Sequence, residues 1–230
     1  MNILVVAAHP DDEILGAGGT IAKYSAKGDH VYVCILCEQC LARKNKPKHD
    51  DFLEQIHAAK NSVGIKEILF FDFPNIQMNT VPTLKIVQAI EQTIVQFKPE
   101  VVYTHHWGDV NEDHRVISNA TMAAVRLPER GTVSSLPRNL IRKVLCYETP
   151  SSTEWASPDK ESAFLPNVFV DIEKTLDVKL KALQCYQNVM KDYPHPRSVE
   201  AITAHAKDCG VRAGLKAAEA FVLIRELIVE

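Results

Sequence analysis

Apolar runs alternate with amphipathic stretches through the first half of the chain, and this alternation limits the fold more than any other feature. We expect buried strands at residues 3–8, 30–36, 67–71 and 101–104. Helices are expected to follow them at residues 13–27, 50–63, 82–97 and 114–126. Strands and helices that alternate with short connections are typical of a parallel sheet covered by helices on both faces. The sequence therefore predicts an α/β fold with a mostly parallel sheet.

The pattern changes after about residue 127. We expect, in chain order, a loop at 128–137, strands at 143–148 and 167–170, a long helix at 172–190, a turn between Pro194 and Pro196, and a final helical region. No sharp change of composition marks an independent second domain. We therefore expect a single domain over residues 1–230, with a core at about 1–127 and a C-terminal elaboration at 128–230.

The composition excludes several classes of protein. With 46% hydrophobic and 24% charged residues, the chain has the composition of an ordinary globular protein and not of a disordered or coiled-coil one. A formal net charge of −3 offers no basic surface for the phosphates of a nucleic acid. No run approaches the ~20 apolar residues that span a bilayer. We therefore expect neither a nucleic acid nor a membrane as a partner.

The N-terminal run and the cysteines both indicate a cytoplasmic protein. No basic residue precedes the apolar residues 2–8, and acidic residues follow at once, so this run is not a signal peptide. A chain of this length can build a core without disulfides, so its six cysteines are expected to be free thiols. Cys34, Cys37 and Cys40 lie at two-residue gaps, but the further cysteines that an iron–sulfur or zinc site needs are missing.

Two groups of histidine and acidic residues follow predicted strands. The first lies at residues 9–13 and the second at residues 105–114. Ligands of open parallel sheets bind outside the carboxyl ends of the strands, and the two groups meet there if the first and fourth strands are neighbours. Imidazole and carboxylate groups are ligands for zinc and similar divalent metals. The sequence therefore favours a metal site at this edge of the sheet.

Two other patterns in these segments imitate known binding motifs. The glycines at positions 16, 18 and 19 suggest a dinucleotide site, but Ile21 stands where that motif needs glycine, and close packing of helix on sheet explains them better. Asp109, Asn111 and Asp113 imitate the start of an EF-hand loop, but His114 stands where that loop requires glycine. Neither pattern is expected to bind its usual ligand.

The stretch Ala8-His9-Pro10-Asp11-Asp12-Glu13, with the glycines that follow it, resembles the signature of the PIG-L/LmbE-like metal-dependent N-deacetylases. Asp113-His114 matches the second motif of that family, and weaker similarity at 193–198 and 218–221 extends the resemblance over nearly the whole chain. The resemblance implies a Rossmann-like fold and a hydrolase that removes the N-acetyl group of an amino sugar, such as N-acetylglucosamine, or of a glycoside. The implied partner is thus a small-molecule amino-sugar substrate; a homo-oligomer stays open.

The resemblance also implies roles for individual residues. His9, Asp12 and His114 would bind the metal, Zn²⁺ or another divalent ion such as Fe²⁺, and Asp11 would be the general base for a metal-bound water that attacks the amide. Asn111 stands where many members carry a histidine; it can donate a hydrogen bond to an oxyanion but cannot act as a general acid. Alternatively, Asn111 caps the helix that follows. Because asparagine cannot donate a proton to the leaving amine, the general acid would be Asp11 itself or His195.

Further residues are expected around this centre. Glu38, Arg115, His195 and Arg197 are candidates for contact with substrate, while Asp113 and His105 are candidates for holding the metal ligands from behind. Each has a simpler alternative as a solvated or structural residue.

Two other functions remain open. One is deacylation of a small non-sugar amide, and the other is a non-catalytic metal- or nucleotide-binding relative. Asp11 separates the second from an enzyme, because a binding module needs no carboxylate beside the open metal position.

Overall fold

The computed structural model describes residues 1–37, 49–187 and 189–229. Its strands are β1 (Asn2–Ala7), β2 (His30–Ile35), β3 (Glu67–Phe70), β4 (Val101–His105), β5 (Lys143–Tyr147), β6 (Val168–Asp171) and β7 (Ala218–Glu226). They form a seven-stranded sheet in the order β3-β2-β1-β4-β5-β7-β6. The first five strands run parallel, and β7 lies antiparallel to both β5 and β6.

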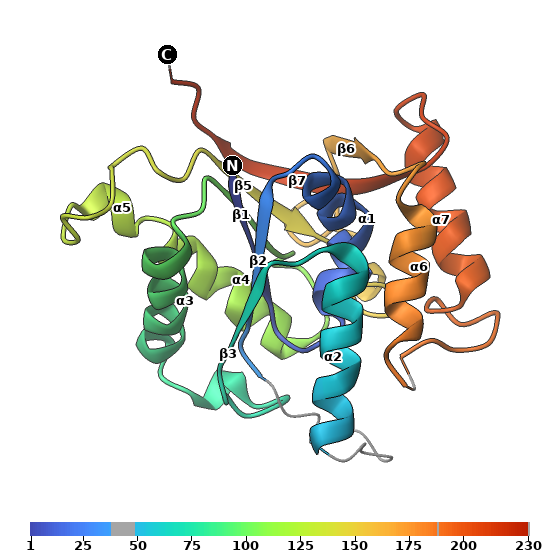
Figure 1. Cartoon of the computed structure of the whole chain (residues 1–230), viewed down its shortest axis with the longest axis horizontal. Helices are drawn as coiled ribbons and strands as arrows, with labels where there is room; N and C mark the ends of the chain where they lie inside the picture. The colour runs from blue at the N-terminus through green and yellow to red at the C-terminus, as the bar shows by residue number, and fades with distance from the viewer. Residues whose placement is uncertain (38–48, 188, 230) are drawn as a thin grey trace.

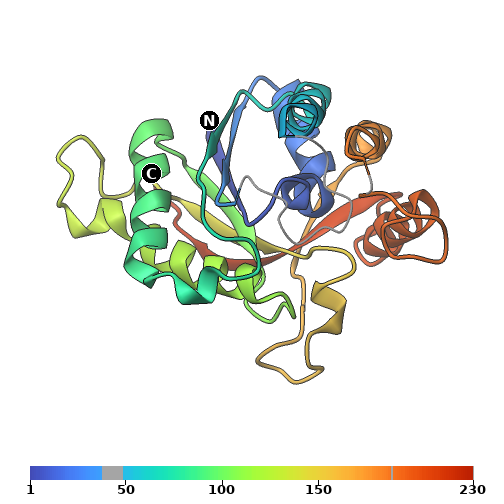
Figure 2. The ribbon, with the colours of Figure 1, turned by 90° about the horizontal axis from the view of Figure 1, so that it is seen from below.

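Helices cover both faces of this sheet (Figures 1 and 2). They are α1 (Asp12–Ala26), α2 (His49–Val63), α3 (Thr83–Phe97), α4 (Glu112–Ala124), α5 (Leu127–Arg130), α6 (Leu176–Gln184) and α7 (Val199–Val211), with short 3₁₀ turns η1 (Met78–Thr80) and η2 (Thr153–Trp155). Alternate residues of β1 point into two cores: Ile3 and Val5 pack under α1, α2 and α6, and Leu4 and Val6 pack under α3 and α4. The predicted α/β fold is confirmed.

The neighbouring positions of β1 and β4 bring the two polar groups together. Val5 of β1 pairs in parallel with Tyr103 of β4, so both strands end at the same edge of the sheet. Helix α1 begins directly beyond β1, and α4 begins at Glu112, two residues earlier than the sequence pattern indicated. His114 therefore lies in the first turn of α4 and not at its start.

Three expectations for the C-terminal part were wrong. The segment 128–137, expected to be a loop, begins within the short helix α5. The predicted helix at 172–190 is shortened to α6, because the Asp171 carboxylate accepts from the amide of Glu173 in a turn, and the buried side chains of Tyr186 and Val189 follow after the helix has ended. The final helical region ends at Val211, and the strand β7 follows. Its alanine, glutamate and leucine residues favour a helix locally, but pairing with β5 on one side and β6 on the other makes it a strand.

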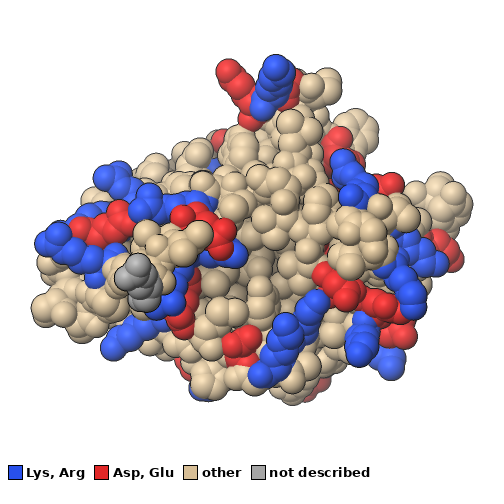
Figure 3. All heavy atoms as spheres, turned by 90° about the horizontal axis from the view of Figure 1, so that it is seen from above, with Lys and Arg blue, Asp and Glu red and all other residues tan. Residues whose placement is uncertain are grey.

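Charged residues of both signs lie on the surface (Figure 3). On the face in Figure 3, lysine and arginine side chains are interspersed with acidic ones and separated by neutral areas. Among the described helices, none has both the length and the apolar character needed to cross a membrane.

Candidate metal centre

Three buried side chains meet at the carboxyl ends of β1 and β4. His9 lies in the turn after β1, Asp12 is the first residue of α1, and His114 comes from the first turn of α4. Asp12 Oδ2 lies 3.2 Å from His9 Nδ1 and 3.3 Å from His114 Nε2. One ligand atom from each of the three lies within 4.8 Å of the other two. We call His9, Asp12 and His114 the triad.

The other nitrogen of each histidine ring lies against a second carboxylate. His9 Nε2 is 3.0 Å from Asp113 Oδ2, and His114 Nδ1 is 3.0 Å from Asp109 Oδ2. Asp113 also accepts from the amides of Ile76 and Met78, at 2.6 and 3.0 Å. Asp109 is similarly held by hydroxyl donors, which are Ser152 and Thr153. Carboxylates in these positions fix the orientation of metal-binding histidines and raise their basicity.

The triad fits a divalent metal. Two imidazole nitrogens and one carboxylate are a common set of three protein ligands for zinc, with a further position left for water or substrate. His114 Nε2 is buried and, among the described residues, has no hydrogen-bond partner of good geometry, although Asp12 lies close to it. A buried polar atom in this state is costly unless something binds it. A metal ion held between Asp12 and His114 would bind the carboxylate oxygen and the ring nitrogen, and so satisfy both atoms.

The charges around the triad favour a cation. Burial opposes a charge on His114, but the Coulombic effect of Asp12 and the close contact with the Asp109 carboxylate raise its pKa to about 10. Burial likewise opposes the charge on His9, while its contacts with Asp113 and Asp12 raise its pKa to about 8. Burial would raise the pKa of the Asp109 carboxyl, but its close contact with His114 lowers that pKa to about 2. The carboxylates therefore favour a positive charge here, whether it is carried by protons or by a metal.

His105 packs behind the triad as a neutral ring. It is fully buried, and its ring stacks on His114 with centroids 3.9 Å apart and an angle of 14°. Its Nε2 accepts from the amide of Ala8 at 2.9 Å and lies 3.1 Å from the Tyr147 hydroxyl. Burial is the main cause that holds its pKa well below the usual value. His105 thus supports both the end of β1 and the ring of His114.

Asp11 is held in an unusual backbone conformation next to the triad. Its φ of 108° is one that non-glycine residues rarely adopt, and such residues cost on the order of 1–3 kcal/mol. The Asp11 amide donates to Glu13 Oε2 at 3.1 Å, and the Tyr186 hydroxyl donates to Glu13 Oε1 at 2.9 Å. Burial, and then the charge of Asp11, raise the pKa of Glu13 to about 8. Arg197 Nη1 lies 3.9 Å from Asp11 Oδ2.

The comparisons with known proteins agree with this arrangement. The family described as PIG-L, GlcNAc-PI de-N-acetylase, matches residues 4–125, just over half of the chain. The chain belongs to the PIG-L family.

Two curated relatives of this PIG-L protein are named as deacetylases. The uncharacterized deacetylase YaiS of Escherichia coli is 27% identical over an alignment that covers 81% of this chain and 91% of YaiS. The 1D-myo-inositol 2-acetamido-2-deoxy-alpha-D-glucopyranoside deacetylase of Rhodococcus opacus is 26% identical, with 97% of this chain and 91% of the relative covered.

Solved structures share the fold. The N,N'-diacetylchitobiose deacetylase of Pyrococcus horikoshii has a TM-score of 0.79 and 18% identity, covering 97% of this chain and 84% of that chain. The 4-carboxy-2-hydroxymuconate hydratase GalB of Pseudomonas putida has a TM-score of 0.77 and 22% identity, with 100% and 98% covered. Since one of these proteins is named as a hydratase, the fold by itself does not decide the reaction.

The other residues that the sequence predicted for the site of this PIG-L protein lie at various positions outside the triad. Asn111 caps α4, because its side-chain oxygen accepts from the amide of Asp113 at 3.0 Å, so only its amide nitrogen is left to donate. Arg115 pairs with Glu112 on the exposed face of α4, and the structure does not bring it to the triad. His195 Nδ1 accepts from the amide of Arg197 at 3.0 Å, within the proline-bracketed turn. Glu38 lies outside the described residues, as does Cys40.

The structure adds residues that sequence reasoning missed. Asp109 belongs to the second polar group, but no role was expected for it. Its spacing from Asn111 and Asp113 was the signal that could have indicated one. Ser152, Thr153 and Tyr147 follow or end β5, and nothing in their local sequence indicates that they reach Asp109 and His105. Their role depends on β5 lying next to β4 in the sheet.

Proposed function

We propose that this PIG-L protein is a zinc-dependent hydrolase that removes the acetyl group from an N-acetylated amino sugar. One observation carries the proposal: the adjacent carboxylates Asp11 and Asp12 have different surroundings. Asp12 contacts both histidines of the triad, whereas Asp11 faces Arg197. A protein that only binds a metal needs no second buried carboxylate in a strained backbone. An amide hydrolase needs one to take a proton from water.

The residues of the chain have separate tasks in this proposal. His9, Asp12 and His114 would hold the ion, while Asp109 and Asp113 fix the two rings. When bound, zinc supplies a Lewis acid that polarises the amide carbonyl and lowers the pKa of water. Asp11 would take the proton of the attacking water and can return it to the leaving amine.

Substrate recognition would draw on the segments around Asp11. Arg197 would meet the substrate beside Asp11, and the nitrogen of the Asn111 amide could donate to the developing oxyanion. His195 stays the alternative proton donor. The amino-sugar substrate is supported by the family description and by the names of the Rhodococcus and Pyrococcus deacetylases. The free cysteines among the described residues support a reducing, cytoplasmic setting.

The decisive experiment measures acetate released from a panel of N-acetylated sugars, including N-acetylglucosamine, its glycosides and its nucleotide-linked forms. We expect release from a subset of them, loss of release after treatment with a chelator, and recovery with Zn²⁺. Fe²⁺ in place of Zn²⁺ tests which metal supports turnover. Small non-sugar N-acetyl amides in the same panel test the alternative substrate class. A metal-loaded protein that releases acetate from no sugar would overturn the proposal.

The metal assignment has its own test. His9→Ala and His114→Ala proteins should each lose the ion bound at the triad while keeping their fold, as measured by elemental analysis and circular dichroism. If both variants retained the metal of the parent protein, the assignment of the triad would be wrong.

A further inference from the structure

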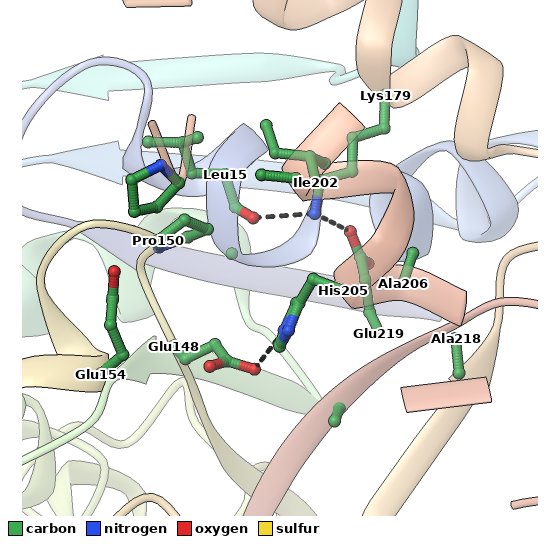
Figure 4. A pocket seen from close by; sticks show the side chains of 14 residues that line it. Leu15, Glu148, Pro150, Glu154, Lys179, Ile202, His205, Ala206, Ala218 and Glu219 are labelled. Atoms are coloured by element: carbon green, nitrogen blue, oxygen red, sulfur yellow. Dashed lines mark hydrogen bonds and ion pairs between the residues drawn. The ribbon is translucent and has the colours of Figure 1, made fainter. Parts of the chain in front are cut away.

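A pocket lies away from the triad. It has a volume of about 290 Å³ and is enclosed by α1, α6, α7, β7 and the segment after β5 (Figure 4). Its lining includes Leu15, Glu148, Ile202 and His205, and none of the triad side chains. Two charged side chains on the wall formed by α6 and β7 form an ion pair with each other, in which Lys179 Nζ lies 2.7 Å from Glu219 Oε1.

Three side chains of types that can bind a metal gather beside this pocket, one from the segment after β5 and two from α7. Glu148 directly follows β5, and His205 and Cys209 lie four residues apart on α7, so both point from the same face of that helix. His205 Nε2 lies 2.7 Å from Glu148 Oε1 and 3.6 Å from Cys209 Sγ. One ligand atom of each residue lies within 4.8 Å of the others. Cys209 is only 1% exposed, whereas Glu148 and His205 reach the pocket.

The spacing of these atoms is close to that of a tetrahedral zinc site. Zn–N and Zn–S bonds of ~2.05 and ~2.3 Å place nitrogen and sulfur ligands roughly 3.6 Å apart, and a nitrogen and an oxygen ligand roughly 3.3 Å apart. The observed nitrogen–sulfur distance is 3.6 Å. The nitrogen–oxygen distance of 2.7 Å is that of the hydrogen bond which His205 and Glu148 make now. A small rotation of the partly exposed His205 ring would open it to the required separation.

The chemistry of the donors favours a soft divalent cation. Thiolate and imidazole select zinc over the hard cations calcium and magnesium, which take oxygen ligands. The hydrogen bonds of His205, first to Cys209 and then to Glu148, raise its pKa to about 10, so this position also favours a positive charge. The triad of the proposed deacetylase contains no cysteine, which makes the two sites chemically distinguishable.

We propose that Glu148, His205 and Cys209 form a second metal site, which binds Zn²⁺ with a fourth coordination position open to the pocket. The bound ion would link the end of β5 to α7. The open position could take water or a small carboxylate or thiol ligand that fits the pocket. The site is independent of the proposed deacetylase activity, and either can fail without the other.

Cobalt substitution tests this site. The metal-free protein is titrated with Co²⁺, and absorption is recorded together with the number of ions bound per chain. We expect two ions per chain and a near-ultraviolet thiolate-to-cobalt charge-transfer band. Cys209→Ser should remove the band and one bound ion, and His205→Ala should do the same. His114→Ala should lose the other ion and keep the band.

Cys185→Ser is the matched control, because Cys185 is a partly exposed cysteine directly after α6 whose thiol donates to the carbonyl of Lys181 and lies near the Ser62 hydroxyl. It should keep both ions and the full band. Circular dichroism of each variant shows that it has folded; if Cys209→Ser fails to fold, His205→Ala decides the result. The proposal is overturned if the parent protein shows no thiolate band, or if the band persists in His205→Ala and in folded Cys209→Ser.

Discussion

Four aspartates surround the two histidines of the triad, and the partners of each one decide what it can do. Asp12 contacts both rings, Asp113 and Asp109 each hold one ring from the far side, and Asp11 faces Arg197. The same side chain can thus act as a metal ligand, as the orienting partner of a histidine, or as a base. The surroundings of each carboxylate, more than its residue type, separate these tasks.

Asp11→Asn tests the proposed base. The variant keeps the size of the side chain and removes its ability to take a proton, so turnover should fall by ~10²–10⁴-fold with metal content and fold unchanged. Steady-state kinetics and elemental analysis measure the two effects. Loss of the metal would instead make Asp11 a ligand, and unchanged turnover would remove it from the mechanism.

Asp109→Asn tests the orientation of His114. Ser152 and Thr153 donate to different oxygens of Asp109, so the single amide oxygen of asparagine can accept from only one of them, and the negative charge beside His114 Nδ1 is lost. We expect metal affinity to fall by ~10–100-fold, the usual effect of removing such a partner. Competition with a chromogenic chelator measures the affinity. Asp113→Asn should weaken binding in the same way through His9, and an affinity equal to that of the parent protein would contradict the assigned role.

Asn111→Ala separates two roles of one side chain. Loss of the cap on α4 should lower the free energy of unfolding by ~0.5–2 kcal/mol, measured by urea denaturation. If the amide also donates to the oxyanion, kcat should fall by ~10–10³-fold as well. Asn111→Asp retains the cap and serves as the control for stability. A less stable variant with the kcat of the parent protein would leave Asn111 with the capping role alone.

At the scale of elements, the kink in α1 shows how the C-terminal part completes the core. Helical geometry is interrupted at Ala17, where φ is −140°. The Glu219 carboxylate of β7 accepts from the amides of Gly19 and Thr20 at 2.9 and 2.7 Å. Lys179 of α6 donates to the carbonyl of Leu15 at 2.8 Å. These two buried side chains therefore satisfy backbone groups on both sides of the kink.

Glu219→Ala should be strongly destabilising. It leaves the Lys179 ammonium buried without its partner and uncaps the second half of α1, and breaking a buried pair in this way costs ~3–5 kcal/mol. Denaturant unfolding measures the change. The matched control is Glu129→Ala, which breaks the exposed pair with Arg225 and should cost only ~0–1 kcal/mol. Equal effects of the two substitutions would contradict the importance of the buried pair.

The close contact of α1 with the sheet explains one glycine directly. A Cβ on Gly16 would lie 2.2 Å from Tyr147 Cδ2, so no larger residue fits without moving that ring. The Tyr147 hydroxyl donates to the carbonyl of Val6 and contacts His105. The packing interpretation of the glycines is thus confirmed at this position, and it connects the packing of α1 to the support of the triad.

At the scale of the whole molecule, residues from distant parts of the chain meet near Asp11. Arg197 donates through Nε to the carbonyl of Pro150 and to Ser151 Oγ, at 3.1 and 2.8 Å, while its Nη1 approaches Asp11. The turn that carries Arg197 therefore lies against the segment after β5 and next to the start of α1. A single guanidinium connects three regions of the chain.

Arg197→Ala should mainly weaken substrate binding. We expect KM to rise with metal content unchanged, because the side chain approaches Asp11 and not the triad. Steady-state kinetics on the preferred N-acetyl sugar give both constants. Arg115→Ala is the control, since that arginine pairs with Glu112 on an exposed helix face, and it should leave both constants unchanged. If KM and kcat were also unchanged in Arg197→Ala, the turn would have no part in binding.

The sequence alone determined the elements that have strong local signals. The strands at 3–8 and 30–36 were predicted to within a residue, because continuous apolar runs bounded by polar turns have few other structures open to them. The helix before Pro99 was equally clear from the spacing of Ile86, Ile90 and Ile94. The polar residues at the ends of the first and fourth strands indicated the candidate metal site, because the α/β pattern predicts that parallel strands end at the same edge of the sheet.

Only the tertiary structure decided the features that depend on neighbours. Residues 218–226 have the local preferences of a helix, and they form a strand because β5 and β6 satisfy their backbone on both sides. Asp109 gained its role because Ser152 and Thr153 come to it from beyond β5. Glu148, His205 and Cys209 meet only because α7 packs near the end of β5. The spacing of apolar residues in the local sequence indicates whether a segment forms a strand or a helix. The partner of a side chain, in contrast, depends on contacts between segments far apart in the chain.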